Sequence, residues 1–106
     1  MSDSTPPRVR ILRAVTDIPA GRVSTYGCVG VASGAGPRQV AAVLAHDPGA
    51  ADVPWHRVVG AGGLLRIPHP VGHAEQRKRL LAEGVLLNER SVRDFASVFF
   101  DVSDLR

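Results

Sequence analysis

The chain has 106 residues, 44% of them hydrophobic and 22% charged, which predicts one small globular domain and excludes both a second catalytic domain and wholesale disorder. Twelve arginines and one lysine against ten acidic residues leave a net charge of +3 and a pI near 10.0. One cysteine excludes an intrachain disulfide, and the absence of a signal peptide or an apolar run of roughly 18 residues predicts a soluble protein.

A helix is predicted near the N-terminus. Thr5 is a candidate N-cap, the two prolines after it suit the first helical positions, and the helix is expected to end near Asp17. The apolar residues on one face of this helix are Val9, Leu12 and Val15. They predict that this face packs against the core.

Two short helices joined by a tight turn are predicted next. Residues 22–25 form a short extended segment, and Thr25 suits the N-cap of a helix over residues 26–33, which a glycine ends. Pro37 suits the first position of the following helix, which cannot continue through Pro48. This arrangement is typical of a helix-turn-helix.

The second of these helices has two different faces. Its predicted core-facing residues are Val40, Val43 and Leu44. Its predicted exposed residues are Arg38, Ala41, Ala42 and Ala45. One arginine therefore projects from a surface of methyl groups, which allows close approach to another backbone, although alanine also favours a helix through its propensity alone.

The second half of the chain is predicted to hold a hairpin and one further helix. Apolar segments 57–59 and 64–67 flank a glycine-rich turn, which predicts a β-hairpin of the kind that forms a wing after a helix-turn-helix. Another helix is expected over about residues 73–83. We therefore predict a mainly α fold, a winged helix-turn-helix DNA-binding domain with a small β-hairpin wing.

The predicted domain is a single unit over residues 1–106, with a core over about residues 6–90 and a tail, 91–106, that carries no interpretable pattern. Residues 8–79 hold ten basic residues against four acidic ones, whereas residues 80–106 hold three against five. This asymmetry favours a face that binds a polyanion, although a basic surface can also serve solubility alone.

The residue spacing argues against several catalytic chemistries. Only His69 and His73 have the spacing of metal ligands, and no cysteine or carboxylate pair completes a zinc site. The sequence contains neither a serine-hydrolase elbow nor a phosphate-binding loop. Cys28 is either a nucleophile or, as is commoner for a lone cysteine in a short helix, a small buried apolar residue. We expect no metal and no cofactor.

The most informative segment is Pro-Trp-His-Arg-Val-Val at residues 54–59. It resembles the Pro-Cys-His-Arg-Val active-site motif of the O6-alkylguanine-DNA alkyltransferases. Trp55 stands where those enzymes have the alkyl-accepting cysteine, a replacement typical of the alkyltransferase-like proteins. The resemblance extends from Ile18 to Val85 through the segments IPAGRVSTYG, PRQVAAVLAHDP, PWHRVV and LLAEGV. It implies the DNA-binding domain of that family without the N-terminal domain of the transferases.

The resemblance implies roles for individual residues. Arg38 matches an arginine that enters the duplex from the minor groove and fills the gap left by an extruded nucleotide. Tyr26 matches a tyrosine that presses on the phosphate beside that nucleotide. Asp47 lies where the family has the asparagine of a hinge between the recognition helix and the active-site loop. The residues that we expect at the DNA are Thr25, Tyr26, Arg38, Gln39, Ala41, Ala42 and Ala45.

His56 and Glu83 match the pair that relays a proton from the reactive cysteine in the transferases. Dealkylation by that route needs a thiolate, and an indole offers no comparable nucleophile, so Trp55 cannot accept an alkyl group. It can form a flat wall for a flipped base, where stacking is worth about 1–3 kcal/mol, or it is simply a core residue ahead of a strand. The expected lesion pocket contains Tyr26, Trp55, Val58 and Arg66.

We therefore expect a lesion-binding protein and not an enzyme. It is expected to flip O6-alkylguanine out of duplex DNA, hold it without alkyl transfer and mark it for nucleotide excision repair. We expect a cytoplasmic monomer, nucleoid-associated in a bacterium, with excision-repair proteins as further partners and no membrane contact. The alternatives are a winged-helix regulator that does not read damage and residual alkyl transfer through Cys28.

Overall fold

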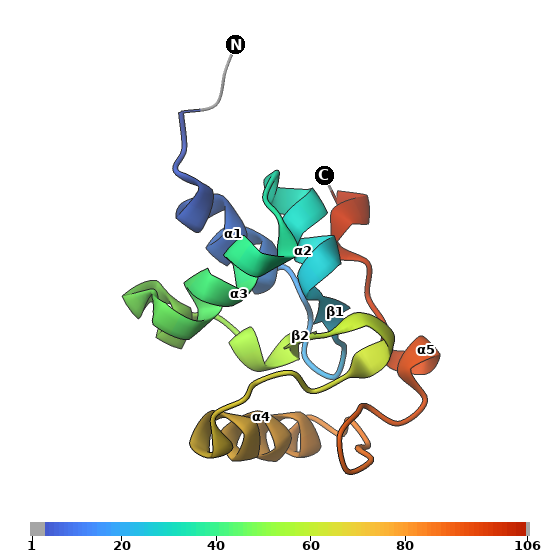
Figure 1. Ribbon diagram of the computed structural model, residues 1–106. Coiled ribbons are helices and arrows are strands. Elements are labelled where there is room, and N and C mark those ends of the chain that lie inside the picture. The colour runs from blue at the N-terminus through green and yellow to red at the C-terminus, as the bar shows by residue number, and fades with distance from the viewer. Residues whose placement is uncertain (1–3, 106) are drawn as a thin grey trace.

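The computed structural model describes residues 4–105 and is mainly helical, as predicted (Figure 1). The helices and strands are α1 (Pro7–Thr16), β1 (Ser24–Thr25), α2 (Tyr26–Ser33), α3 (Pro37–His46), β2 (Val58–Val59), α4 (Pro70–Ala82) and α5 (Phe95–Val98). The 3-10 helices are η1 (Pro48–Asp52), η2 (Trp55–Arg57), η3 (Ala61–Gly63) and η4 (Val102–Leu105). Within residues 4–105, no helix has the length and apolar character that crossing a membrane requires.

Helix α1 begins at Pro7, whose missing N–H costs nothing at the first helical position. Its N-cap is Pro6, so the capping role predicted for Thr5 is wrong. The fully buried residues of α1 are Ile11, Ala14 and Val15. Val9 and Leu12, expected in the core, are only partly buried, because α1 packs against both α2 and α3 and turns a neighbouring face inward.

Helices α2 and α3 form the predicted helix-turn-helix. Thr25 Oγ1 accepts a hydrogen bond from the Cys28 N–H at 3.0 Å, which confirms Thr25 as the N-cap of α2. The turn is tight, since a Cβ atom on Gly30 would lie 2.6 Å from the carbonyl oxygen of Ala35. Only glycine permits this approach, and it lets α3 leave the turn in contact with both α2 and α1.

The two strands pair in parallel, with Ser24 opposite Val58. The predicted β-hairpin wing is therefore wrong, because residues 64–67 do not pair with β2. Leu64 instead forms an isolated antiparallel bridge with Ser91. A parallel pair joins segments that are distant in the sequence, and local alternation of apolar residues cannot reveal such a partner.

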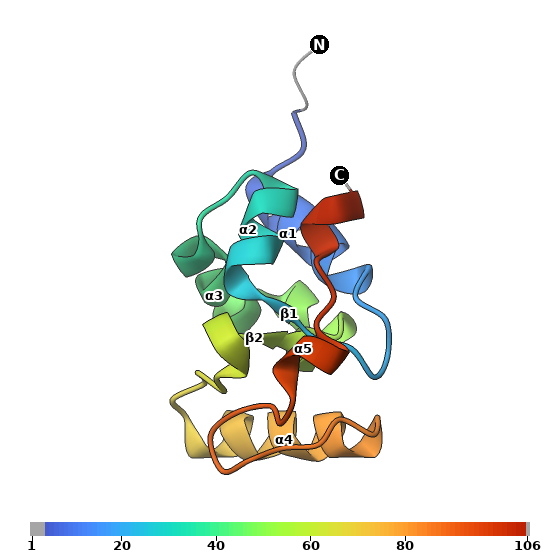
Figure 2. The same ribbon diagram turned by 90° about the vertical axis from the view of Figure 1, so that its right-hand side faces the viewer.

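Helix α4 lies on the side of the small sheet away from α1 and α2 (Figures 1 and 2). It begins at Pro70, earlier than the predicted start near residue 73, since His69 Nδ1 accepts a hydrogen bond from the Val71 N–H at 3.2 Å and caps the helix. Gln76 and Leu80 form its fully buried face. Helix α4 packs against η2.

The C-terminal residues, for which the sequence predicted no structure, complete the core. The Val23 N–H donates to the Val98 carbonyl oxygen at 2.9 Å, and the Phe100 N–H donates to the Val23 carbonyl oxygen at 2.7 Å. These bonds place the segment beside β1. Val102 has no exposed surface and packs with α1 and α2 in the main core cluster, so the core extends beyond residue 90, where we expected it to end.

Candidate nucleic-acid interface

The outer face of α3 has the character that the sequence predicts. Arg38 and Gln39 lie exposed in its first turn, whereas Val40 is fully buried. The small exposed residues that follow are Ala41, Ala42 and Ala45. One long basic side chain therefore stands beside a run of methyl groups, and such a helix can approach the floor of a groove as narrow as the minor groove of DNA.

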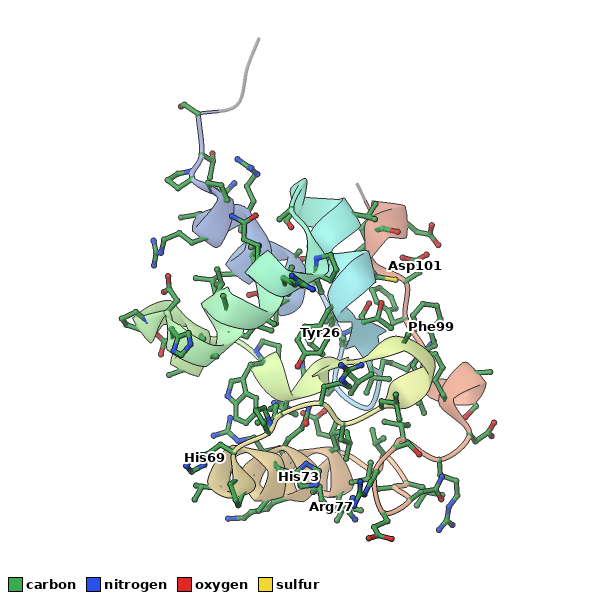
Figure 3. The ribbon with its side chains drawn as sticks, viewed as in Figure 1. Tyr26, His69, His73, Arg77, Phe99 and Asp101 are labelled. Carbon is green, nitrogen blue, oxygen red and sulfur yellow. The ribbon has the colours of Figure 1, made fainter. Side chains whose placement is uncertain are left out.

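The charge of Arg66, in the loop after η3, acts on the hydroxyl of Tyr26, on α2. Tyr26 is the first residue of α2 and is half-buried next to α3 (Figure 3). Burial raises the pKa of Tyr26, and the positive charge of Arg66 partly opposes this rise. Two of the residues predicted for the lesion pocket are thus coupled electrostatically.

Arg66 also borders a surface hollow of about 520 Å³. The other residues that line this hollow are Leu65, Ile67, Pro68, Pro70, His73, Glu89 and Arg90. Tyr26 and Trp55 do not line it, so it is not the predicted lesion pocket. Val58 has no exposed surface, because the pairing of β2 with β1 places it in the core, so it does not line an open pocket as we predicted.

Trp55 is the first residue of η2 and is half-buried, outside both core clusters. Its indole meets the His56 ring edge-on, with 6.1 Å between the ring centroids. The guanidinium carbon of Arg79, on α4, lies 5.1 Å from the indole centroid, within cation–π distance. Arg79 Nε in turn donates to Glu75 Oε2 at 2.8 Å. The indole is thus held between its neighbour in η2 and an arginine of α4.

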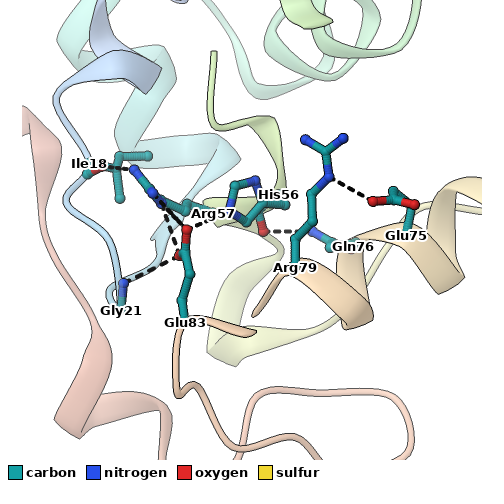
Figure 4. Close-up of polar contacts among 8 residues, drawn as sticks. All are labelled: Ile18, Gly21, His56, Arg57, Glu75, Gln76, Arg79 and Glu83. Carbon is teal, nitrogen blue, oxygen red and sulfur yellow. Dashed lines mark hydrogen bonds and ion pairs between the residues drawn. The ribbon is translucent and has the colours of Figure 1, made fainter. Parts of the chain in front are cut away.

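His56 and Glu83, predicted as a pair, are in direct contact beneath Trp55. His56 Nε2 lies 2.9 Å from Glu83 Oε2 (Figure 4). Arg57 forms an ion pair with the same carboxylate oxygen, 2.6 Å from its Nη2, and its Nη1 donates to the Ile18 carbonyl oxygen at 2.8 Å. The Gly21 N–H completes the set around Glu83. One carboxylate therefore joins η2, the end of α4 and the segment before β1.

These contacts determine the protonation states of the pair. Burial lowers the pKa of His56, and the hydrogen bond to Glu83 opposes this only in part. Burial would raise the pKa of Glu83, but hydrogen bonds from Arg57 and His56 outweigh it and lower that pKa to about 2. At neutral pH the pair is a neutral imidazole whose Nε2–H donates to a carboxylate. The His56 Nδ1 atom is buried without a hydrogen-bond partner among the described residues.

Three residues of this site were not singled out from the sequence. Arg57 lies inside the quoted motif, and its position next to His56 was the available signal. Gln76 is fully buried and its Nε2 donates to the carbonyl oxygens of His56 and Val58, at 3.2 and 3.0 Å. Arg79 belongs to the basic run of α4, and nothing in that run distinguishes the arginine that contacts Trp55.

Comparisons with known proteins identify the domain. The family model of the 6-O-methylguanine DNA methyltransferase DNA-binding domain matches residues 6–85. The chain belongs to this family. It is 42% identical over 88 residues to the DNA base-flipping protein of Escherichia coli strain K12, a match that covers 81% of this chain and 66% of that protein.

A further relative and a solved structure, both from Schizosaccharomyces pombe, connect this methyltransferase family member to the alkyltransferase-like proteins. The alkyltransferase-like protein 1 of Schizosaccharomyces pombe is 36% identical over 91 residues, which cover 81% of this chain and 82% of that protein. The crystal structure of S. pombe Atl1 in complex with damaged DNA containing O6-carboxymethylguanine superposes with a TM-score of 0.80 at 29% identity, over 89% of this chain and 94% of that one. The resemblance found in the sequence is confirmed.

The remaining candidate residues of this family member have local structural contacts. Cys28 is half-buried in α2, packs against the main core cluster and lies beside Asp101, so it has the small-residue packing role that we considered. Thr25 caps α2, and Asp47 ends α3 and begins η1. Among residues 4–105, no three histidine, cysteine, aspartate or glutamate side chains are grouped so that they could hold a metal ion.

Proposed function

We propose that this protein binds O6-alkylguanine in duplex DNA, flips the damaged nucleotide out of the helix and holds it without transferring the alkyl group. One observation carries the proposal: the half-buried indole of Trp55 occupies the alkyl-acceptor position of the family motif, directly beside an intact His56–Glu83 pair. The residues proposed for recognition and proton relay accompany an indole that stands where the transferases have their nucleophile.

The chemistry of that substitution argues against alkyl transfer. The transfer step needs a soft, ionised nucleophile, which a cysteine thiolate provides and a tryptophan does not. His56 Nε2 donates to Glu83, but no acidic hydrogen on Trp55 is available for the imidazole to remove. Cys28, the single cysteine, packs in a different part of the fold, within the core formed by α1 and α2. The protein is therefore a binder of the lesion and not an enzyme.

The arrangement of α2 and α3 supports nucleotide flipping. With α3 in the minor groove, its exposed alanines permit a close approach, and Arg38 at its start can enter the stack that the flipped nucleotide leaves. Arginine suits this task because its planar guanidinium can both hydrogen-bond and stack. Tyr26, the first residue of α2, is proposed to press on the neighbouring phosphate. The E. coli relative is named a DNA base-flipping protein, which accords with this arrangement.

Selectivity for damage follows from two energetic differences. Extruding a nucleotide costs a few kcal/mol, and less where an O6-alkyl group has already weakened the base pair. Trp55 then offers the extruded base an aromatic surface, on which stacking contributes about 1–3 kcal/mol. A relative of this chain, S. pombe Atl1, forms a complex with DNA that contains O6-carboxymethylguanine.

A protein that holds a lesion without repairing it needs a second system to remove it. We propose that the bound complex marks the site for nucleotide excision repair. We also propose that the protein acts as a monomer and that, in a bacterium, it is cytoplasmic and associated with the nucleoid. The bound protein and the extruded nucleotide are the features that a repair complex can recognise.

Competition binding with matched duplexes tests the proposal. Two duplexes that differ only by one O6-methyl group on a single guanine are titrated at fixed salt, because phosphate contacts make affinity salt-dependent. We expect tighter binding to the alkylated duplex and unchanged mass of the protein after prolonged incubation. Equal affinity for both duplexes would instead indicate a winged-helix regulator, and a stable mass increase on Cys28 would indicate residual transfer.

A further inference from the structure

Arg8, on α1, forms an ion pair with Asp47, the residue that ends the recognition helix α3. Arg8 Nε donates to Asp47 Oδ2 at 2.5 Å, and Arg8 Nη2 donates to Asp47 Oδ1 at 2.9 Å. The planar guanidinium thus binds both carboxylate oxygens, the geometry in which arginine and a carboxylate interact most strongly. The Asp47 side chain is only 11% exposed, whereas that of Arg8 is 51% exposed.

Asp47 is the point at which α3 turns into the loop that leads to Trp55. Its N–H donates to the Val43 carbonyl oxygen at 2.9 Å and closes the last turn of α3. Its Oδ1 accepts the Gly49 N–H at 2.8 Å and caps η1. After η1 the chain continues through two residues into η2, which begins at Trp55. The relative direction of α3 and of that loop is therefore determined at one carboxylate.

The turn also packs tightly against α1. A Cβ atom on Gly49 would lie 2.9 Å from Leu12 Cδ1 and 3.2 Å from Asp47 Oδ1, so a larger residue at this position would have to displace the end of the Leu12 side chain. Helix α1 thus contacts the turn at two points, through the Arg8 ion pair and through the Leu12 side chain. An ion pair in this place resists rotation of α3 against the loop.

We propose that Arg8 is a positioning residue for lesion recognition: by holding Asp47, it sets the angle between α3, which presents Arg38, and the loop that presents Trp55. The inference rests on the proposed function for its consequence at DNA. Arg38 and Trp55 have to act on the same nucleotide, one in the stack and one outside it, so a change in this angle separates them.

The chemistry of the pair also explains the aspartate. An asparagine at position 47 could still accept the Gly49 N–H, but its amide nitrogen would then face the donors of Arg8, and both groups would lack an acceptor. Arg8 and a carboxylate at position 47 are therefore a matched pair. Substituting one partner leaves the other partly buried without its counter-charge, and substituting both removes the conflict.

A double-mutant cycle on DNA binding tests the proposal. The variants are Arg8→Leu, Arg8→Lys, Asp47→Asn and the double variant Arg8→Leu/Asp47→Asn, with Arg13→Ala as a control that removes an exposed arginine from the same helix. The measured quantity is the ratio of affinities for the O6-methylguanine duplex and the matched guanine duplex. We expect each of Arg8→Leu and Asp47→Asn to lower this ratio by roughly tenfold, within the usual coupling range.

The other variants separate positioning from charge. Arg8→Lys keeps the charge without the bidentate fork and is expected to lower the ratio by an intermediate amount. The double variant is expected to recover most of the ratio, and Arg13→Ala to weaken both complexes equally. Equal weakening of both complexes by Arg8→Leu, with a shallower salt dependence, would make Arg8 a phosphate contact and overturn the proposal. A double variant no better than the singles would do the same.

Hydrogen exchange in the free protein provides a readout that does not depend on DNA. The Gly49 amide is expected to exchange faster in Arg8→Leu than in the unsubstituted protein, and to return toward the original rate in the double variant. Unchanged exchange in Arg8→Leu would overturn the positioning role. Failure of the proposed function has a different result, since the unsubstituted protein itself would not distinguish the two duplexes.

Discussion

The guanidinium carbon of Arg79 lies 5.1 Å from the centroid of the Trp55 indole, and the same arginine is held by Glu75 at 2.8 Å. Helix α4 therefore does more than support the fold, because it contacts the residue that, under the proposed function, stacks on the flipped base. A guanidinium against one face of the indole limits the rotamers of Trp55 and leaves its remaining surface for a ligand. The restricted motion of the Trp55 ring is the first property that can be tested.

We expect Arg79→Ala to loosen the Trp55 ring and to weaken lesion binding by about two- to fivefold, the range of a partly exposed cation–π contact. Trp55 is the single tryptophan, so intrinsic fluorescence reports on this residue alone. The emission of Arg79→Ala should shift as the ring gains contact with water. Lys78→Ala is the matched control, because it removes an adjacent exposed charge from the same helix. Identical emission in both variants would contradict the role of Arg79.

We expect Arg38→Ala to weaken binding to the lesion duplex by roughly 1–3 kcal/mol, the usual cost of one lost base contact. Arg38 is exposed at the start of α3, so the substitution should leave the free energy of unfolding nearly unchanged. Equilibrium binding and thermal unfolding measure the two quantities. Arg13→Ala serves as the charge-matched control on α1. If Arg38→Ala and Arg13→Ala bind alike, Arg38 acts only as general positive charge.

The exposed alanines of α3 predict a steric limit on DNA binding. Ala42→Leu should weaken binding to damaged and undamaged duplexes alike, by roughly tenfold, because a larger side chain prevents close approach of the helix. Ala74→Leu places the same side chain on an exposed site of α4 and should leave binding unchanged. Titration of both variants against both duplexes measures the effect. Normal binding by Ala42→Leu would show that this face does not enter a groove.

The depressed pKa values of His56 and Glu83 predict that acid destabilises the protein in two steps. Both groups bind protons less readily in the folded state than in the unfolded chain, so their stabilisation is present at higher pH and is lost on acidification. The His56 contribution begins to fall as pH drops below about 6.5. That of Glu83 falls between about pH 4.5 and its folded pKa of about 2, and is on the order of 2–3 kcal/mol.

Denaturant unfolding at a series of pH values checks this prediction. In Glu83→Gln the loss of stability below pH 4.5 should be smaller than in the unsubstituted protein, while the variant is less stable at neutral pH because Arg57 loses its ion pair. Parallel pH profiles of the two proteins would mean that other carboxylates dominate acid unfolding, Asp47 being the first candidate since its pKa is also lowered to about 2.

The helix-turn-helix was predictable because its signals are local. Thr25 as N-cap, a glycine after α2 and Pro37 at the start of α3 each act within a few residues, and all three occupy the predicted positions. The prediction of which face of α3 is exposed was also correct, since the buried residues lie in a single stripe and the remaining residues face outward. Stripe prediction was only partly right on α1, where Val15 is buried as predicted, but Ile11 and Ala14 take the core positions expected for Val9 and Leu12.

Prediction was poorest where partners are distant. The expected hairpin gave way to a parallel pair between β1 and β2, and the C-terminal segment that carried no pattern proved to hold Val102 in the core. The pair of Arg8 with Asp47 and the contact of Arg79 with Trp55 join different helices and loops. Charged side chains on separate elements carry no sequence signal of their pairing.

The sequence by itself determined the helix-turn-helix, its basic and methyl-rich outer face, and the tryptophan inside the segment that resembles the family's active-site motif, because each depends on residue type and short spacing. Only the tertiary structure decided what surrounds that indole, which residues hold Glu83, and how α3 is oriented against the loop of Trp55. Those relationships arise from long-range packing, in which ion pairs and close contacts form only after the helices have been brought together.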